Sequence, residues 1–149
     1  MEKLVALLEN FWEWTGLDQE KWNKVDFNDA GVDPVDYPLL GEMCQICMGL
    51  INKELSSDEM NHFLTALAID NEDEDVLYAC KTRGTDDFLY RMALCGITHR
   101  QSDARWQIAE LLHLPIRDRN RLLKILLSDS HAYVRKRAEN TLWDLNNRP

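Results

Sequence analysis

Two cysteines three positions apart are the first residues in this chain that could carry chemistry. Cys44 and Cys47 have the spacing of a zinc-ligand pair or a redox pair. A structural zinc site needs four ligands within tetrahedral reach, and the chain has no second close pair. Because free cysteine also behaves as a small buried apolar side chain, we expect no metal and no other cofactor. We assign core positions to all four cysteines: Cys44, Cys47, Cys80 and Cys95.

A run of acids is the second candidate site. Residues 70–75 read Asp-Asn-Glu-Asp-Glu-Asp, which is five acids in six positions. A calcium loop of the helix–loop–helix type needs a central glycine and a closing glutamate at a fixed offset, and this run has neither. One interpretation is a solvated turn that begins a helix, because acids are favoured at a helix N-terminus. The other interpretation is one edge of an acidic docking surface for a protein.

Recognisable motifs of catalysis are absent from the sequence. The four histidines match no zinc-protease pattern and are scattered at His62, His99, His113 and His131. Neither a G-x-S-x-G motif nor a phosphate-binding glycine loop is present, and the chain has six glycines in all. We therefore predict that this protein is not an enzyme.

Charge restricts the class of partner. The chain carries a net charge of −9 and has a pI near 4.8, which disfavours nucleic acid and anionic lipid and favours a basic protein. Residues 1–84 hold 18 acids and 6 bases, whereas residues 85–149 hold 8 acids and 11 bases. No apolar run approaches the ~20 residues of a membrane span, and no export signal is visible. We expect a cytoplasmic protein with reduced thiols.

The elements that must position these residues are helices. Apolar residues recur at helical spacing, and no segment alternates as a strand does. We expect helices at 2–15, 37–55, 57–69, 73–83, 86–97, 102–113, 117–127 and 131–146. The acidic stretch 17–36 is irregular, with a short helical turn at 19–24.

One apolar spacing occurs three times, in copies that lie 28 and 30 residues apart. The reference residues of the three copies are Ile69, Ile97 and Leu127. In each copy another apolar residue stands two positions before the reference residue, and two more stand seven and eleven positions after it. A fixed period of this size is typical of stacked supersecondary units. The equivalent positions are Leu67, Cys95 and Ile125; Ile69, Ile97 and Leu127; Val76, Ala104 and Val134; Cys80, Ile108 and Ala138.

The last copy resembles the second helix of a short HEAT repeat, with Asp129 followed by Val134-Arg135-Lys136-Arg137-Ala138 and closing at Leu142. The same pattern stands one unit earlier, and a poorer copy precedes it, because Leu77 replaces the arginine. The earlier residues are Asp103, Ala104-Arg105, Ile108 and Leu112, and then Val76-Leu77 and Cys80.

The resemblance implies an all-α, right-handed stack of antiparallel helix pairs, a HEAT-like α-solenoid. Residues 1–149 would form one domain, with three helix pairs in 57–146 and a divergent helical N-terminal cap with an acidic loop in 1–56. It further implies that second helices line the concave face, and that an Asp–Arg ladder joins the units. We expect structural use of this kind, rather than contact with nucleic-acid phosphates, for the basic residues of the last two copies: Arg117, Arg119, Arg121, Arg135, Lys136 and Arg137.

Alignment of the copies puts Tyr78, Trp106 and Lys136 in one column. Because a lysine occupies this column, we expect it to face solvent, with the two aromatic rings side by side. Large exposed aromatics among charges are typical anchors of protein interfaces. The alternative is that each ring packs on its neighbour. We predict a contact surface that consists of Asp26, Asp29, Asp33, Asp36, Asp73, Glu74, Tyr78 and Trp106.

These features favour a non-catalytic module that binds a basic protein and is a monomer before the complex forms. By analogy of size, charge and architecture, it resembles an immunity protein or antitoxin that neutralises a nuclease-type toxin. One alternative is a HEAT-like DNA glycosylase, which needs a basic DNA-facing concavity that the N-terminal half lacks. Another alternative is a scaffold subunit of a larger complex.

Overall fold

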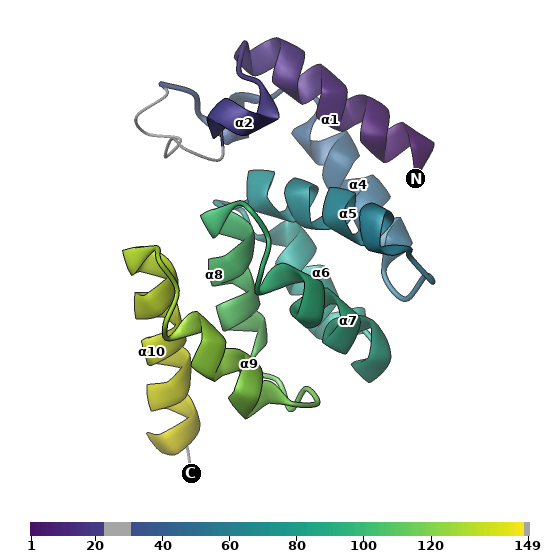
Figure 1. The fold of residues 1–149 in the computed structure, drawn as a ribbon. Helices are drawn as coiled ribbons and strands as arrows, with labels where there is room; N and C mark the ends of the chain where they lie inside the picture. The colour runs from purple at the N-terminus through teal and green to yellow at the C-terminus, as the bar shows by residue number, and fades with distance from the viewer. Residues whose placement is uncertain (23–30, 148–149) are drawn as a thin grey trace.

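The computed structural model describes residues 1–22 and 31–147, and within them it is all-helical, as expected (Figure 1). These residues form nine α-helices and one 3-10 helix and no strand. The helices are α1 (Glu2–Thr15), α2 (Gln19–Trp22), η1 (Pro34–Asp36), α4 (Leu40–Leu50), α5 (Ser57–Ile69), α6 (Asp75–Arg83), α7 (Asp86–Gly96), α8 (Ser102–Leu111), α9 (Arg119–Leu126) and α10 (Ala132–Asn147).

Local sequence signals explain several helix ends. α1 stops at Gly16, whose φ of 66° lies in the left-handed region that favours glycine. Ser56 and Glu59 form a capping box at the start of α5, in which each side chain accepts the other's backbone N–H. α4 is shorter than the expected 37–55. It ends at Leu50 because Asn52 adopts a φ of 68° and its amide bonds to the turn between α6 and α7.

The helices make contact in two series. α4, α6, α8 and α10 touch one another in that order, and so do α1, α5 and α7 (Figure 1). The two series meet because α4 packs on α1 and α5, and α8 packs on α5 and α7. α8 therefore lies in the middle of the molecule, with α10 against its outer side.

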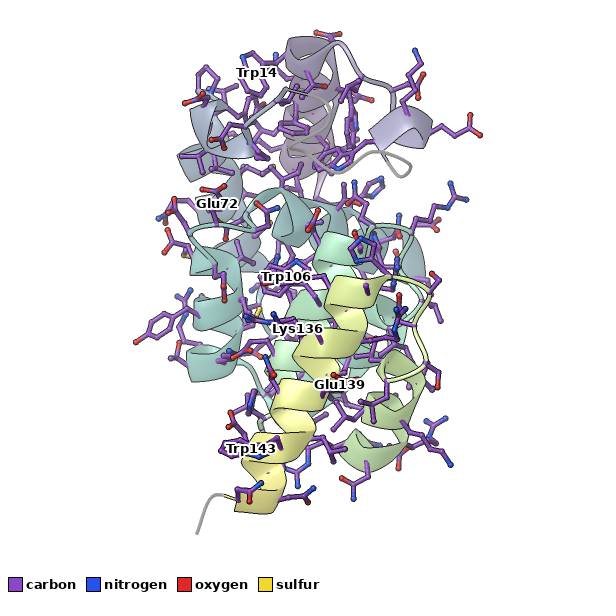
Figure 2. All side chains as sticks on the ribbon, turned by 90° about the vertical axis from the view of Figure 1, so that its left-hand side faces the viewer. Trp14, Glu72, Trp106, Lys136, Glu139 and Trp143 are labelled. Atoms are coloured by element: carbon purple, nitrogen blue, oxygen red, sulfur yellow. The ribbon has the colours of Figure 1, made fainter. Side chains whose placement is uncertain are left out.

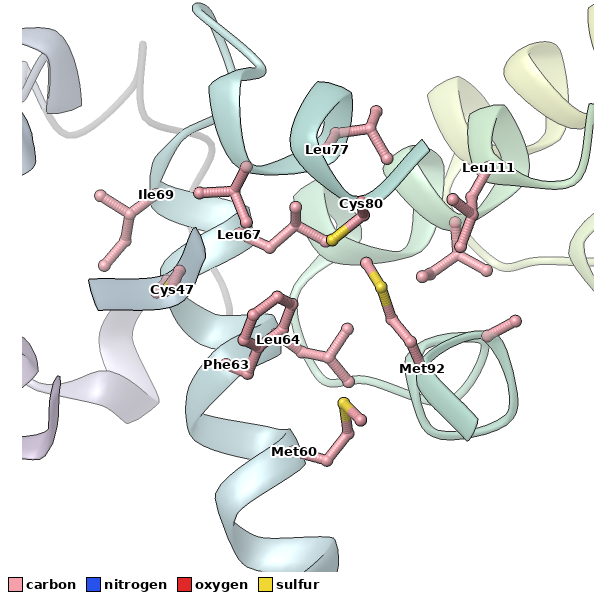
Figure 3. Packing of buried hydrophobic residues seen from close by; sticks show 14 of the residues in the cluster. Cys47, Met60, Phe63, Leu64, Leu67, Ile69, Leu77, Cys80, Met92 and Leu111 are labelled. Atoms are coloured by element: carbon pink, nitrogen blue, oxygen red, sulfur yellow. The ribbon is translucent and has the colours of Figure 1, made fainter. Parts of the chain in front are cut away.

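Most of the repeated apolar positions form the core. The columns of Val76 and of Cys80 are fully buried in all three copies. Figure 3 shows side chains from α4, α5, α6, α7 and α8 meeting around Cys80 and Met92. The column of Leu67 is different, because Leu67 is buried, Cys95 is half-buried and Ile125 is 42% exposed. No described helix follows α10 to cover the last copy.

Two arginines bond to the turns that precede their helices, and one of them also joins two successive copies. Arg105 of α8 holds both carboxylate oxygens of Asp129, at 2.7 Å and 3.0 Å. Its Nη1 also donates to the carbonyls of the preceding turn, six and five residues back. Arg135 of α10 donates to carbonyls at the same two offsets. Of the arginines expected to have a structural use, Arg135 therefore makes bonds within the fold. The bond between Arg105 and Asp129 is an Asp–Arg contact of the kind that the resemblance implies.

An aromatic cluster fills the N-terminal end. The Phe11 ring lies within 5.2 Å of the Trp12, Trp22 and Tyr37 rings, measured between centroids. The Tyr37 hydroxyl donates to the carbonyl of Leu7 at 2.9 Å, which ties η1 and α4 to α1. In the part of the chain that the structure describes, no helix has the length and apolarity that crossing a membrane requires.

Candidate protein-binding surface

The acidic turn between α5 and α6 lies on the surface, and we call residues 72–75 the acidic turn from here on. Glu72, Asp73 and Asp75 are exposed, and Glu74 is half-buried. Figure 2 shows Glu72 projecting from this part of the molecule. No salt bridge joins these four carboxylates to a described cation, whereas most carboxylates near α8 are paired. Their negative charge is therefore available to a partner.

Asp70, which precedes the acidic turn, has a structural role. It is 1% exposed, and its Oδ2 accepts the backbone N–H of Val76 at 2.8 Å. This bond caps the start of α6, where the N-cap residue Glu74 makes no side-chain cap. Burial raises the pKa of Asp70 to about 6, and the nearby carboxylates of Asp75 and Asp73 add to the rise, against the opposing Val76 N–H.

Tyr78 stands one turn into α6 and is 69% exposed, as the sequence predicts. Its backbone N–H donates to the carbonyl of Glu74 at 2.8 Å, so residue 78 completes the first helical turn after the acidic turn. Thr82, one turn further along α6, is also at the surface. An exposed aromatic residue therefore lies one helical turn after the four carboxylates of the acidic turn.

The prediction that Trp106 is exposed beside Tyr78 is wrong. Trp106 is 5% exposed, and its indole Nε1 donates to Asp103 at 3.0 Å. The Tyr133 ring packs edge-on against it at 5.7 Å, and the Arg137 guanidinium stacks over it at 4.8 Å. Both covering side chains come from α10. Trp106 belongs to the contact between α8 and α10, not to a free surface.

Tyr78 and Trp106 differ in exposure because the helix that follows each of them in the series, α8 for Tyr78 and α10 for Trp106, carries different side chains. A shift of 30 positions places Asp103 where α10 has Tyr133, and Gln107 where α10 has Arg137. Asp103 is short, and Gln107 turns inward to donate to the carbonyl of Leu67 at 2.7 Å. α8 therefore has no long side chain at these positions to cover Tyr78, whereas α10 has two for Trp106.

Ion pairs cross the helices beside Trp106. Glu110 of α8 pairs with Lys81 of α6 and with Arg137 of α10, each at 3.0 Å. Burial alone would raise the pKa of Glu110, but the hydrogen bond and charge of Lys81, together with Arg137, hold it below its usual value. His113 adds a contact to Asp144 at 3.0 Å. These charges are used inside the fold.

The remaining predicted acids lie elsewhere or are not described. Asp33 caps η1 by accepting the N–H of Val35 at 3.0 Å, and Asp36 ends the same short helix with its side chain exposed. η1 packs on α4, and α4 packs on α6, so these two acids and the acidic turn flank a common helix. Asp26 and Asp29 lie outside the described residues.

The cysteines do not form a recognisable reactive centre. Cys44, Cys47 and Cys80 are buried, Cys95 is half-buried, and all four are free thiols. Burial raises the pKa of each thiol, which keeps it in the unreactive protonated form. Over residues 1–22 and 31–147, no group of three or more histidine, cysteine and acidic side chains is placed to hold a metal ion.

Two exposed aromatics on α10 were not predicted. Trp143 is 65% exposed and Tyr133 is 43% exposed. The repeat spacing contains a signal for Trp143, because it stands seven residues after Lys136, on the face of α10 to which that exposed lysine belongs. The signal for Tyr133 is weaker, because its exposure depends on how far its ring covers Trp106.

Comparisons with family models, with curated proteins and with solved structures find no match for this chain. The interpretation of the surface therefore rests on its own geometry. Unpaired acids and an exposed tyrosine in neighbouring turns can attract and hold a cationic protein surface.

Proposed function

We propose that this chain is a HEAT-like helical stack that binds a basic protein without catalysis, and that its partner is a nuclease-type toxin which it neutralises. The observation that carries the proposal is the exposed Tyr78 beside the unpaired acidic turn. The contacts between successive helices and the matching bonds of Arg105 and Arg135 support the stack. The assignment to a toxin rests on the small size and acidity of the chain.

Electrostatics and an aromatic anchor would have separate effects on such a complex. Long-range attraction to the acidic turn speeds encounter with a cationic partner and weakens as salt rises. Burial of Tyr78 removes apolar area from water and mainly slows dissociation. The proposal therefore predicts a salt-dependent association rate and a dissociation rate that depends on the tyrosine.

The test is capture from the source cell with native protein and variants in parallel, followed by mass spectrometry. Asp73→Lys with Glu74→Lys should lose a captured protein of high pI, and Tyr78→Ala should weaken its retention. Glu54 is exposed and precedes α5, at the end of that helix away from the acidic turn, so Glu54→Lys is the matched charge-reversal control. Equal capture by all variants would contradict the proposed surface.

Neutralisation is tested on the captured protein once it is purified. A nuclease toxin should lose activity on adding one equivalent of the native chain, and the doubly reversed variant should inhibit it far less. A partner without nuclease activity would contradict the toxin assignment but leave the surface. Tight binding of the free chain to damaged duplex DNA at low salt would instead favour the glycosylase alternative.

A further inference from the structure

The outer face of α10 corresponds to the face of α8 that packs against α10. No described residue packs against this face of α10. A shift of 30 positions aligns Lys136, Glu139, Asn140 and Trp143 of α10 with Trp106, Ala109, Glu110 and His113 of α8. On α8 these positions lie under α10 or bond to it. On α10 all four are exposed. A following helix in this series would pack on this face.

The exposed face carries an ordered stripe of side chains. Ala132, Lys136, Glu139 and Trp143 follow at spacings of four, three and four residues, which keeps them on one side of a helix. All four are exposed, and Figure 2 shows Lys136, Glu139 and Trp143 in succession down α10. The order along the stripe is small, positive, negative and large.

This order is complementary to itself when reversed. In an antiparallel pair of α10 helices, a two-fold axis between Lys136 and Glu139 sets the lysine of each copy against the glutamate of the other. The same axis sets Trp143 of each copy over Ala132 of the other, so a large ring meets a small residue. A two-fold contact of this kind uses the same patch on both molecules and closes after two copies.

We propose that two copies of this chain associate through α10, packed antiparallel about a two-fold axis between Lys136 and Glu139. Neither of these side chains has an ion-pair partner among the described residues, and Trp143 is 65% exposed. The four-residue stripe is formally neutral, whereas the chain carries −9, so two copies meet there with little local repulsion. The proposal replaces the expectation of a monomer before complex formation.

A second copy fits this face better than the basic partner of the proposed function. A cationic protein would be repelled by Lys136, and it would find a stronger negative field at the acidic turn. The dimer uses neither Tyr78 nor the acidic turn, so it can hold or fail independently of the proposed function.

Sedimentation of the purified chain over a concentration series measures the association. We expect a monomer–dimer equilibrium, and we expect Trp143→Ala to weaken the dimer roughly tenfold or more, because a large buried aromatic dominates such contacts. Tyr78→Ala, another exposed aromatic, should leave the dimer unchanged. A native chain that stays monomeric at every concentration, or a dimer indifferent to Trp143→Ala, would overturn the proposal.

A charge exchange tests the two-fold arrangement itself. Lys136→Glu alone and Glu139→Lys alone should each weaken the dimer, because like charges then face each other. The double variant, Lys136→Glu with Glu139→Lys, restores opposite charges and should recover the dimer. Failure of the double variant to recover it, with folding intact by circular dichroism, would overturn the antiparallel register.

Discussion

α6 and α8 occupy successive places in one series of helices, yet they use their charged and aromatic side chains in opposite ways. On α6 the acidic turn is unpaired and Tyr78 is 69% exposed. On α8, Arg105 and Glu110 are paired, and Trp106 is 5% exposed. Equivalent positions of the repeated spacing are therefore exposed or buried according to which side chains the next helix carries.

Under the proposed function, the residues that stabilise the fold and those that bind the partner lie in different parts of the chain. The charges of α8 bond to α6, to α10 and to the turn between α9 and α10 through short contacts that are partly or largely shielded from water. The acidic turn contributes no such bonds and keeps its charge for solvent or a partner. If this comparison is right, substitutions near α8 should mostly change the free energy of unfolding, and substitutions in the acidic turn should mostly change binding.

The largest expected effect is at Arg105. Arg105→Leu leaves the mostly buried Asp129 without its cation and the two carbonyls of the preceding turn without a donor. We expect the free energy of unfolding to fall by about 3 to 5 kcal/mol, measured by chemical denaturation. Arg121→Ala removes an exposed pair with Asp118 and should cost less than about 1 kcal/mol. Equal losses of unfolding free energy in the two variants would contradict the view that the charges of α8 stabilise the fold.

The second effect is the pH dependence set by Asp70. Its pKa is about 6 in the folded chain against 3.8 for an unperturbed carboxyl, so the folded state binds more protons between these values. Stability from this group is present below pH 3.8 and is lost as pH rises through 6. Asp70→Asn should therefore gain stability relative to the native chain between pH 4 and pH 7, by up to about 2 to 3 kcal/mol.

This measurement needs the difference between variant and native chain at each pH. Burial lowers the pKa of His99 from 6.5 to about 4, so its contribution to stability is lost as pH falls through that window. The two groups act in opposite senses and would partly cancel in the native curve alone. A difference that stays constant from pH 4 to pH 7 would show that Asp70 does not change its charge state there.

The smallest effect is at Glu74, whose φ of 54° lies in the left-handed region. Glu74→Gly removes the strain of a side chain in that region and should raise the free energy of unfolding by about 0.5 to 1 kcal/mol. The same change removes one acid of the acidic turn and should weaken partner binding. Asp118→Gly, at the left-handed position before α9, is the control without a binding effect. Loss of stability at Glu74 would contradict this view of the acidic turn.

Much of the fold could be predicted because helices leave local marks. Helical spacing located α1 and α5 to the residue, and the other long helices to within a few residues at each end. The predicted C-terminal end of α4 was wrong, because Asn52 ends the helix through bonds to residues 83 and 85, which are distant in sequence. Of the predicted surface, Tyr78 is exposed as expected and Trp106 is not.

The helices, the core columns and the concentration of acids in the first half can be derived from the amino-acid order alone, since periodicity and charge are properties of the local chain. Which members of a column meet water depends on how the helices pack. Trp106 and Tyr78 have the same repeat position, but Tyr133 and Arg137 reach back over one ring and no residue of α8 reaches over the other. Exposure depends on the side chains of a neighbouring helix, which spacing within one helix does not contain.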